Sequence, residues 1–416
     1  MRTSPQIRTT FAAALVAMLA MAALHGSAGA PMLRATPEAV GMSSERLQMA
    51  TAVLRQAVAD RRLAGGVAAV ARRGKLVYLE PFGVQSVSSK TPMSDRSLFR
   101  IYSMTKAVTS VAVMMLVESN QLQLSDAVSK YLPEFRNVMV QYGATGALRR
   151  PSRAITIRDL LLHTSGLNHR TSELYRRLQV RSRSIGLPQF VVNITAAPLL
   201  EDPGTRYRYS EGTTVLGRIV EVIARQPFDA FVTTRILQPL GMNDTSFWVE
   251  GDAQARLTTV YQRDGDEPMR PVEVEDVPFT EKPALIEGAV GLVSTAEDFV
   301  RFSQMLLNKG ELDGVRLLKA ETVASMTVNA LPDAILQGKG GNVGWGLGNV
   351  DVVVGPGSRG YLTSIGEYGW DGSIGTFFSI DPAKELIVTL MTQNIPANPQ
   401  NIRQRFKSAV IQSVVE

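Results

Sequence analysis

The chain has no cysteine among its 416 residues and only three histidines. Without cysteine, neither a disulfide framework nor a lipid attached through a cysteine can form, so stability must come from the apolar core. Only His163 and His169 follow the N-terminal segment, and no Gly-x-Ser-x-Gly or His-Glu-x-x-His pattern occurs. These absences argue against a Ser-His-Asp hydrolase and against a metalloenzyme, and we expect neither a metal nor a cofactor.

The chain also lacks a concentrated basic surface. Lysine and arginine number 44 against 38 aspartates and glutamates, and the net charge of +6 is scattered, without a basic stripe with interleaved aromatics. We therefore expect no nucleic-acid partner. Apolar residues make up 45% of the chain, which is enough for a sizeable core.

The N-terminus has the pattern of a secretory signal. Arg2 and Arg8 precede an uninterrupted apolar run at residues 11–24, and small residues follow it. The run is too short to span a bilayer comfortably, and no other run reaches that length. We predict that residues 1–30 are a signal peptide and that residues 31–416 form the mature domain, periplasmic or secreted, without a membrane span. A first buried helix is the alternative.

Strand patterns gather at the two ends of the chain, and helical patterns lie between them. Residues 65–84 predict two strands joined by a tight turn, and residues 373–393 predict a second hairpin around Asp381-Pro382. Helical periodicity covers about 104–118, 156–163, 213–225, 228–237 and 296–308, with further amphipathic helices near both chain ends. Residues 136–153 and 168–190 have the pattern of loops. Residues 250–287 predict loops with a small hairpin. This order indicates an α/β fold, in which helices flank an antiparallel sheet built from both chain ends, with an inserted, mostly helical subdomain.

A serine and a lysine stand three residues apart at the start of an apolar helix pattern, Ser103-Met104-Thr105-Lys106. Residues three apart on a helix share a face, so Ser103 Oγ and Lys106 Nζ can meet. A cation is unfavourable at a helix N-terminus, and burial disfavours it further. One interpretation is that Lys106 takes the proton of Ser103 and makes it a nucleophile. The alternative is a serine cap followed by a lysine that extends to solvent.

A tyrosine motif follows in PGTRYRYSEGTTVLG, residues 203–217. Tyr207 and Tyr209 lie on the same side of an extended piece, and Gly212 opens a helix. An ammonium beside Tyr209 would stabilise its phenolate, so this phenol could act as a general base. A purely structural tyrosine is the alternative.

Two other motifs lie on turns. GEYGWDGSIGTFFSIDP, residues 366–382, is glycine-rich and then becomes a strand. The accessible N–H groups of an edge strand could hold an oxyanion, and a glycine-rich turn before a strand is the alternative. IRDLLLHTSGLN, residues 157–168, reads as structural support, in which His163 makes a packing hydrogen bond.

These motifs resemble, in the family's order, the serine β-lactamase-like superfamily, which comprises class C β-lactamases, D,D-peptidases and family VIII carboxylesterases. The resemblance rests on Ser103-x-x-Lys106, LLLHTSGL, Tyr209-Ser210 and EGAVGLVSTAEDFVRF, and it covers roughly residues 35–400. It implies that Ser103 is acylated, that Lys106 and Tyr209 share the general-base role, and that the backbone N–H groups of Ser103 and Ser373 form the oxyanion hole. It also implies the α/β sandwich with a helical subdomain.

Two positions depart from the class C pattern. Glu211 stands where Tyr-x-Asn has its asparagine, and Trp370-Asp371-Gly372 replaces Lys-Thr-Gly. Trp370 and Asp371 cannot supply the positive charge that engages a penicillin carboxylate, and Asp371 would repel it. A Trp-x-Gly motif resembles the family VIII esterases.

We therefore predict an exported carboxylesterase that acts on a small-molecule ester, with Glu211, Trp370, Asp371 and Gly372 at the substrate. An ion pair between Glu211 and Lys106 would leave more of the base role to Tyr209. The alternatives are a β-lactamase or D,D-peptidase, acyl transfer to an alcohol or amine, and a non-catalytic penicillin-recognising or cell-wall-binding module.

Overall fold

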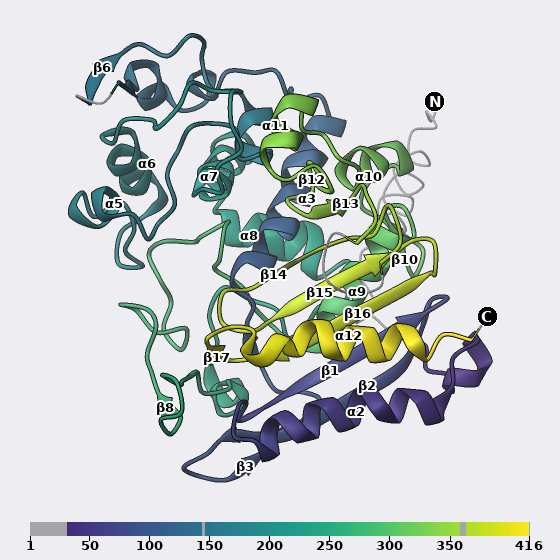
Figure 1. The fold of residues 1–416 in the computed structure, drawn as a ribbon. Coiled ribbons are helices and arrows are strands. Elements are labelled where there is room, and N and C mark those ends of the chain that lie inside the picture. Colours follow the sequence, from purple (N-terminus) through teal and green to yellow (C-terminus); the bar gives the residue numbers. More distant parts are fainter. Residues whose placement is uncertain (1–30, 144–145, 358–362, 416) are drawn as a thin grey trace, which may run out of the picture.

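The computed structural model describes residues 31–143, 146–357 and 363–415. The predicted signal segment, residues 1–30, lies outside the described residues. The main sheet has eight strands in the order β12-β13-β14-β15-β16-β1-β2-β3, and all neighbours pair antiparallel (Figure 1). Its strands are β1 (Gly65–Arg72), β2 (Lys75–Ser86), β3 (Thr91–Pro92), β12 (Val343–Trp345), β13 (Asp351–Val353), β14 (Tyr368–Asp371), β15 (Phe377–Asp381) and β16 (Leu386–Thr392).

The α-helices flank this sheet or form the region beside it. They are α2 (Ser44–Ala59), α3 (Thr105–Glu118), α4 (Ile157–Leu161), α5 (Glu173–Arg177), α6 (Leu187–Thr195), α7 (Gly212–Ala224), α8 (Phe228–Val232), α9 (Ala296–Leu307), α10 (Ala320–Met326), α11 (Asp333–Gly338) and α12 (Ile402–Gln412). Short strands form small separate sheets: β4 (Phe99–Arg100) with β9 (Val293–Ser294), β5 (Val140–Tyr142) with β6 (Ala147–Arg149), β10 (Glu311–Leu312) with β11 (Val315–Arg316), and β7 (Tyr261–Gln262) with β8 (Arg270–Pro271) and β17 (Asn394–Ile395).

The centre of the sheet joins the two ends of the chain. β1 pairs with β2 across the Arg73-Gly74 turn and, on its other side, with β16, where Gly66 lies opposite Thr392. The predicted antiparallel sheet built from both chain ends is therefore confirmed, as are both hairpins.

The two faces of the sheet bury different helices. Along β1, Val67 and Ala69 contribute to the core that contains α9 and α3, whereas Ala68 and Val70 contribute to the core beneath α2 and α12. This alternation follows from the period of two in a strand, which sends neighbouring side chains to opposite faces. Figure 1 shows α2 and α12 side by side on one face, with α9 behind the sheet.

The region beside the sheet is helical, as predicted, and α3 is its central element. Almost every side chain of α3 is buried, from Thr105 to Met114, so this helix is packed on all sides. It contacts α7 and α8, and its N-terminal end points toward the turn after β14. The first turn of α3 therefore holds its side chains rigidly.

The stretch predicted as a loop at 168–190 contains α5 and the start of α6, so that prediction was wrong in part. α6 buries Leu187, Phe190, Val191 and Ile194, which follow a helical period. Its start lacks a side-chain cap, and its paired valines favour strands, so the local signals were weak. Packing against α7 stabilises the helix instead.

Candidate active site

Ser103 lies on a single 3-10 turn, Tyr102–Met104, that leads directly into α3. The residue before it is held in an unusual conformation, since Tyr102 has a φ of 44°, in the left-handed region. This conformation costs a non-glycine residue roughly 1–2 kcal/mol, and such positions cluster at functional sites. The strained turn fixes the direction of the Ser103 N–H and side chain.

The Tyr102 side chain is anchored on the other side of this turn. Its hydroxyl donates to Glu275 Oε1 at 2.7 Å, and Glu275 is paired with Arg181 at 2.6 Å. Burial and the Glu275 carboxylate raise the pKa of Tyr102, so the phenol stays protonated and remains a donor. Arg181 also pairs with the fully buried Glu287. Spacing along the sequence gave no signal for this network.

Lys106 reaches Ser103 as the three-residue spacing predicted. Its Nζ lies 3.3 Å from Ser103 Oγ and 3.0 Å from the carbonyl oxygen of Ala289, and the side chain is buried. The ring centre of Tyr209 lies 4.7 Å from the same nitrogen. The buried Lys106 Nζ is therefore surrounded by a hydroxyl, a carbonyl oxygen and a π face, which together offset the cost of burying this polar group.

The ion pair considered between Glu211 and Lys106 is not formed among the described residues. Glu211 is buried at the start of α7, and its Oε2 accepts a hydrogen bond from Thr214 Oγ1 at 3.4 Å. The geometry thus does not support the shift of the base role from Lys106 to Tyr209 that this ion pair would have caused.

Tyr209 and Trp370 are brought together from distant parts of the chain. Trp370 Nε1 donates to Tyr209 Oη at 3.0 Å, and the ring centres are 5.4 Å apart. Trp345 packs edge-on against both rings. The Trp of the third motif thus supplies a hydrogen-bond donor to the phenol.

His163 has the structural place that the sequence predicted. It is fully buried 4.6 Å from the Tyr209 ring, and its Nδ1 accepts a hydrogen bond from the Ser210 backbone N–H at 3.2 Å. Burial, together with the charge of Lys106, lowers the pKa of His163 well below its ordinary value, so the ring is neutral. His163 positions the Tyr209 segment.

The turn after β14 lies against the serine turn. A Cβ on Gly372 would stand 2.7 Å from the Ile101 carbonyl oxygen, and Thr376 Oγ1 donates to the same oxygen at 3.3 Å. Within the described residues, no hydrogen bond uses the N–H of Ser103 or of Ser373. Both donors are therefore available to an oxyanion.

Asp371 is paired with a residue that the sequence analysis did not single out. Arg403 on α12 donates to Asp371 Oδ2 at 2.6 Å and to the carbonyl oxygens of Gly372 and Thr376 at 2.9 and 3.1 Å. The predicted repulsion between Asp371 and a substrate carboxylate is therefore weakened, because Arg403 compensates the charge. The main effect of Arg403 is to stabilise the turn that contains Ser373.

Within residues 31–143, 146–357 and 363–415, no three histidine, aspartate or glutamate side chains converge as metal ligands. In the same residues, no helix is both long and apolar enough to cross a bilayer.

Comparisons with known proteins show the family of this chain. The beta-lactamase family model matches residues 50–410. Protein Rv1367c of Mycobacterium tuberculosis is 37% identical over 351 residues, which cover 80% of this chain and 86% of the relative. Esterase EstB of Burkholderia gladioli is 31% identical over 366 residues, covering 82% and 88%. The solved structure of EstCE1, a hydrolase with promiscuous acyltransferase activity, is similar with a TM-score of 0.78 and 26% identity, covering 88% of this chain and 98% of that one.

Proposed function

The chain belongs to the beta-lactamase family and is a serine hydrolase of that fold, and we propose that its substrate is a carboxylic ester. The observation that carries the proposal is the contact between Lys106 Nζ and Ser103 Oγ, next to a Tyr209 whose hydroxyl accepts from Trp370. The similarity to EstB, an esterase with 31% identity, supports an ester rather than a β-lactam.

The proposed reaction begins with attack of Ser103 Oγ on the ester carbonyl carbon. The serine proton passes to the pair formed by Lys106 and Tyr209, and the carbonyl oxygen becomes an oxyanion held by the N–H groups of Ser103 and Ser373. The C–O bond then breaks, and the alcohol leaves with the proton. Water attacks the acyl-enzyme along the same path and releases the acid.

The third motif supports this substrate class. Trp370 presents an indole N–H to Tyr209 where the class C pattern has a lysine, so the motif adds a neutral donor and no cation for a substrate carboxylate. The hydrogen bond orients the Tyr209 hydroxyl, and a donor to an oxygen that carries charge during proton transfer is worth more than a donor to a neutral oxygen.

Hydrolysis of p-nitrophenyl butyrate and of nitrocefin by the mature protein tests the proposal. We expect ester turnover that Ser103→Ala abolishes, whereas Ser88→Ala, in an exposed loop, leaves it unchanged. A fluorophosphonate should add covalently to Ser103 in the wild-type protein, as read by peptide mass spectrometry. Undiminished esterase activity in Ser103→Ala would refute the mechanism.

The other readouts separate the alternatives. Dominant nitrocefin turnover would identify a β-lactamase, and neither activity with a stable penicillin adduct would favour a binding module. Adding a short alcohol as acceptor tests acyl transfer, which is the second candidate because EstCE1 combines hydrolysis with promiscuous acyltransferase activity. An ester product above the hydrolysis background would support it.

We also propose that residues 1–30 direct export of the protein. N-terminal sequencing of the protein recovered from the periplasm and the medium tests this. A mature start near residue 31 supports export, whereas an intact Met1 in the cytoplasm contradicts it.

A further inference from the structure

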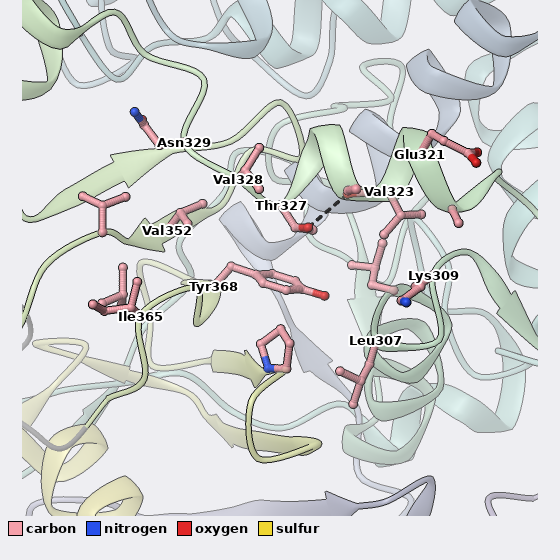
Figure 2. Close-up of a pocket in the computed structure, with 17 residues that line it drawn as sticks. Leu307, Lys309, Glu321, Val323, Thr327, Val328, Asn329, Val352, Ile365 and Tyr368 are labelled. Atoms are coloured by element: carbon pink, nitrogen blue, oxygen red, sulfur yellow. Dashed lines mark hydrogen bonds between the residues drawn. The ribbon is translucent and has the colours of Figure 1, made fainter.

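A second cavity lies away from the catalytic residues. It has a volume of about 660 Å³ and is enclosed by the end of α9, by α10, and by β13 and β14. This volume falls within the range of roughly 300–1,000 Å³ that is typical of small-molecule pockets. Figure 2 shows its lining, which contains none of Ser103, Lys106 and Tyr209.

The walls of this cavity are mainly aliphatic. Leu306, Leu307 and Val323 line it from the helices, and Val352 and Val354 line it from the sheet side. Two further members are unusually exposed for apolar residues, since Ile365 is 68% exposed and Val328 is 53% exposed. Exposed aliphatic side chains that gather around a hollow indicate a surface for an apolar ligand.

Two polar groups of the lining, Tyr368 and the exposed Lys309, are available to a ligand. Tyr368 is only 2% exposed as a residue, but its hydroxyl oxygen is not among the buried polar atoms of the described residues that lack a partner, and no hydrogen bond to it is formed there, so it is accessible from the cavity. Figure 2 shows this hydroxyl pointing toward Lys309, whose ammonium likewise forms no ion pair within the described part of the chain. Burial raises the pKa of Tyr368, so the phenol is a donor at neutral pH.

The other polar members of the lining do not compete for this position. Thr327 Oγ1 already donates to the Val323 carbonyl oxygen at 3.0 Å, and Asn329 Oδ1 accepts from the N–H groups of Leu331 and Trp345. The Glu321 carboxylate points away from Tyr368 (Figure 2). One end of the cavity therefore offers a cation and a hydroxyl, and the other end offers aliphatic side chains.

We propose that this cavity binds a medium- to long-chain aliphatic carboxylate. The carboxylate lies between Lys309 Nζ and Tyr368 Oη, accepts a hydrogen bond from the hydroxyl and pairs with the ammonium. The chain extends over Val352 and Val354 toward Ile365 and Val328. The site is independent of Ser103 and does not rest on the proposed ester hydrolysis.

Isothermal titration calorimetry of the full mature chain with octanoate, decanoate and dodecanoate, each below its micellar concentration, tests the site. We expect saturable one-to-one binding that tightens by up to about fourfold for each added methylene. Lys309→Gln should weaken dodecanoate binding about tenfold, because it removes the charge that pairs with the carboxylate. Ile365→Asp, at an exposed position, should weaken it at least as much.

Two controls complete the experiment. Lys90→Gln removes an exposed lysine from the loop between β2 and β3, and it should leave the affinity unchanged. Decyltrimethylammonium, a cationic amphiphile of the same chain length as decanoate, should bind at least tenfold more weakly than decanoate. Absence of saturable binding, equal affinity for the two amphiphiles, or full affinity in both Lys309→Gln and Ile365→Asp would overturn the assignment.

Discussion

Replacing Trp370 tests the proposed role of Tyr209 as a general base. Trp370→Phe keeps an aromatic ring in place and removes the Nε1–H donor that lies 3.0 Å from Tyr209 Oη. A hydrogen bond is worth about 0.5–1.5 kcal/mol to a neutral acceptor and about 1.5–3 kcal/mol to a charged one. Removing the donor should therefore cost about 1–2 kcal/mol of transition-state stabilisation, which corresponds to roughly a 5- to 30-fold loss in kcat/KM.

The assay measures kcat and KM separately for p-nitrophenyl butyrate. Because the indole donor contacts the group proposed to take the serine proton, we expect kcat to fall while KM changes little. Trp248→Phe is the matched control, since that indole donates to Glu250 at 2.6 Å, outside the site. An unchanged kcat in Trp370→Phe, or a loss confined to KM, would refute the reasoning.

Three further predictions concern stability. Burial raises the pKa of Asp298 to about 6, so the folded state holds this proton more tightly than the unfolded state does. The free energy of unfolding should therefore fall as the pH rises from about 4 to 6. Asp298→Asn should remove up to about 3 kcal/mol of that fall, as measured by urea titrations at each pH. Arg403→Gln removes the 2.6 Å contact with Asp371, so it should lower the free energy of unfolding by about 2–4 kcal/mol and reduce esterase turnover. An unchanged denaturation midpoint would contradict the role of Arg403 in stabilising the turn after β14. Tyr102→Phe removes the donor to Glu275 and should cost about 1.5–3 kcal/mol by chemical denaturation; a neutral effect would show that the anchor is dispensable.

The parts of the site that were predictable are the local ones. Ser103 and Lys106 meet because a helical turn fixes residues three apart, and this holds whatever the rest of the fold does. His163 was identified as structural because its motif ends a short helix, and an antiparallel sheet built from both chain ends followed from the strand patterns there.

The parts that were not predictable depend on tertiary placement. Asp371 was expected to act on the substrate through its charge, but a partner 32 residues later on α12 compensates it. The bond between Tyr102 and Glu275 joins residues 173 positions apart, and no periodicity reports such a pair. Lys106 and Glu211 had suitable charges for an ion pair, yet the packing of α3 and α7 directs them to other partners.

The pairing of β1 with β16 has a consequence for the order of events during biosynthesis. β1 cannot pair with β16 until the chain has been synthesised as far as Thr392, which lies opposite Gly66. Contacts between residues so far apart in sequence give a high contact order, so the middle of the sheet forms late. The turn that carries Ser373 leads into β15, which is itself anchored on β16. A nascent chain that already contains Ser103 and Lys106 is therefore without its second oxyanion donor. On the proposed mechanism, turnover therefore requires a chain that has been completed at least to the end of β16.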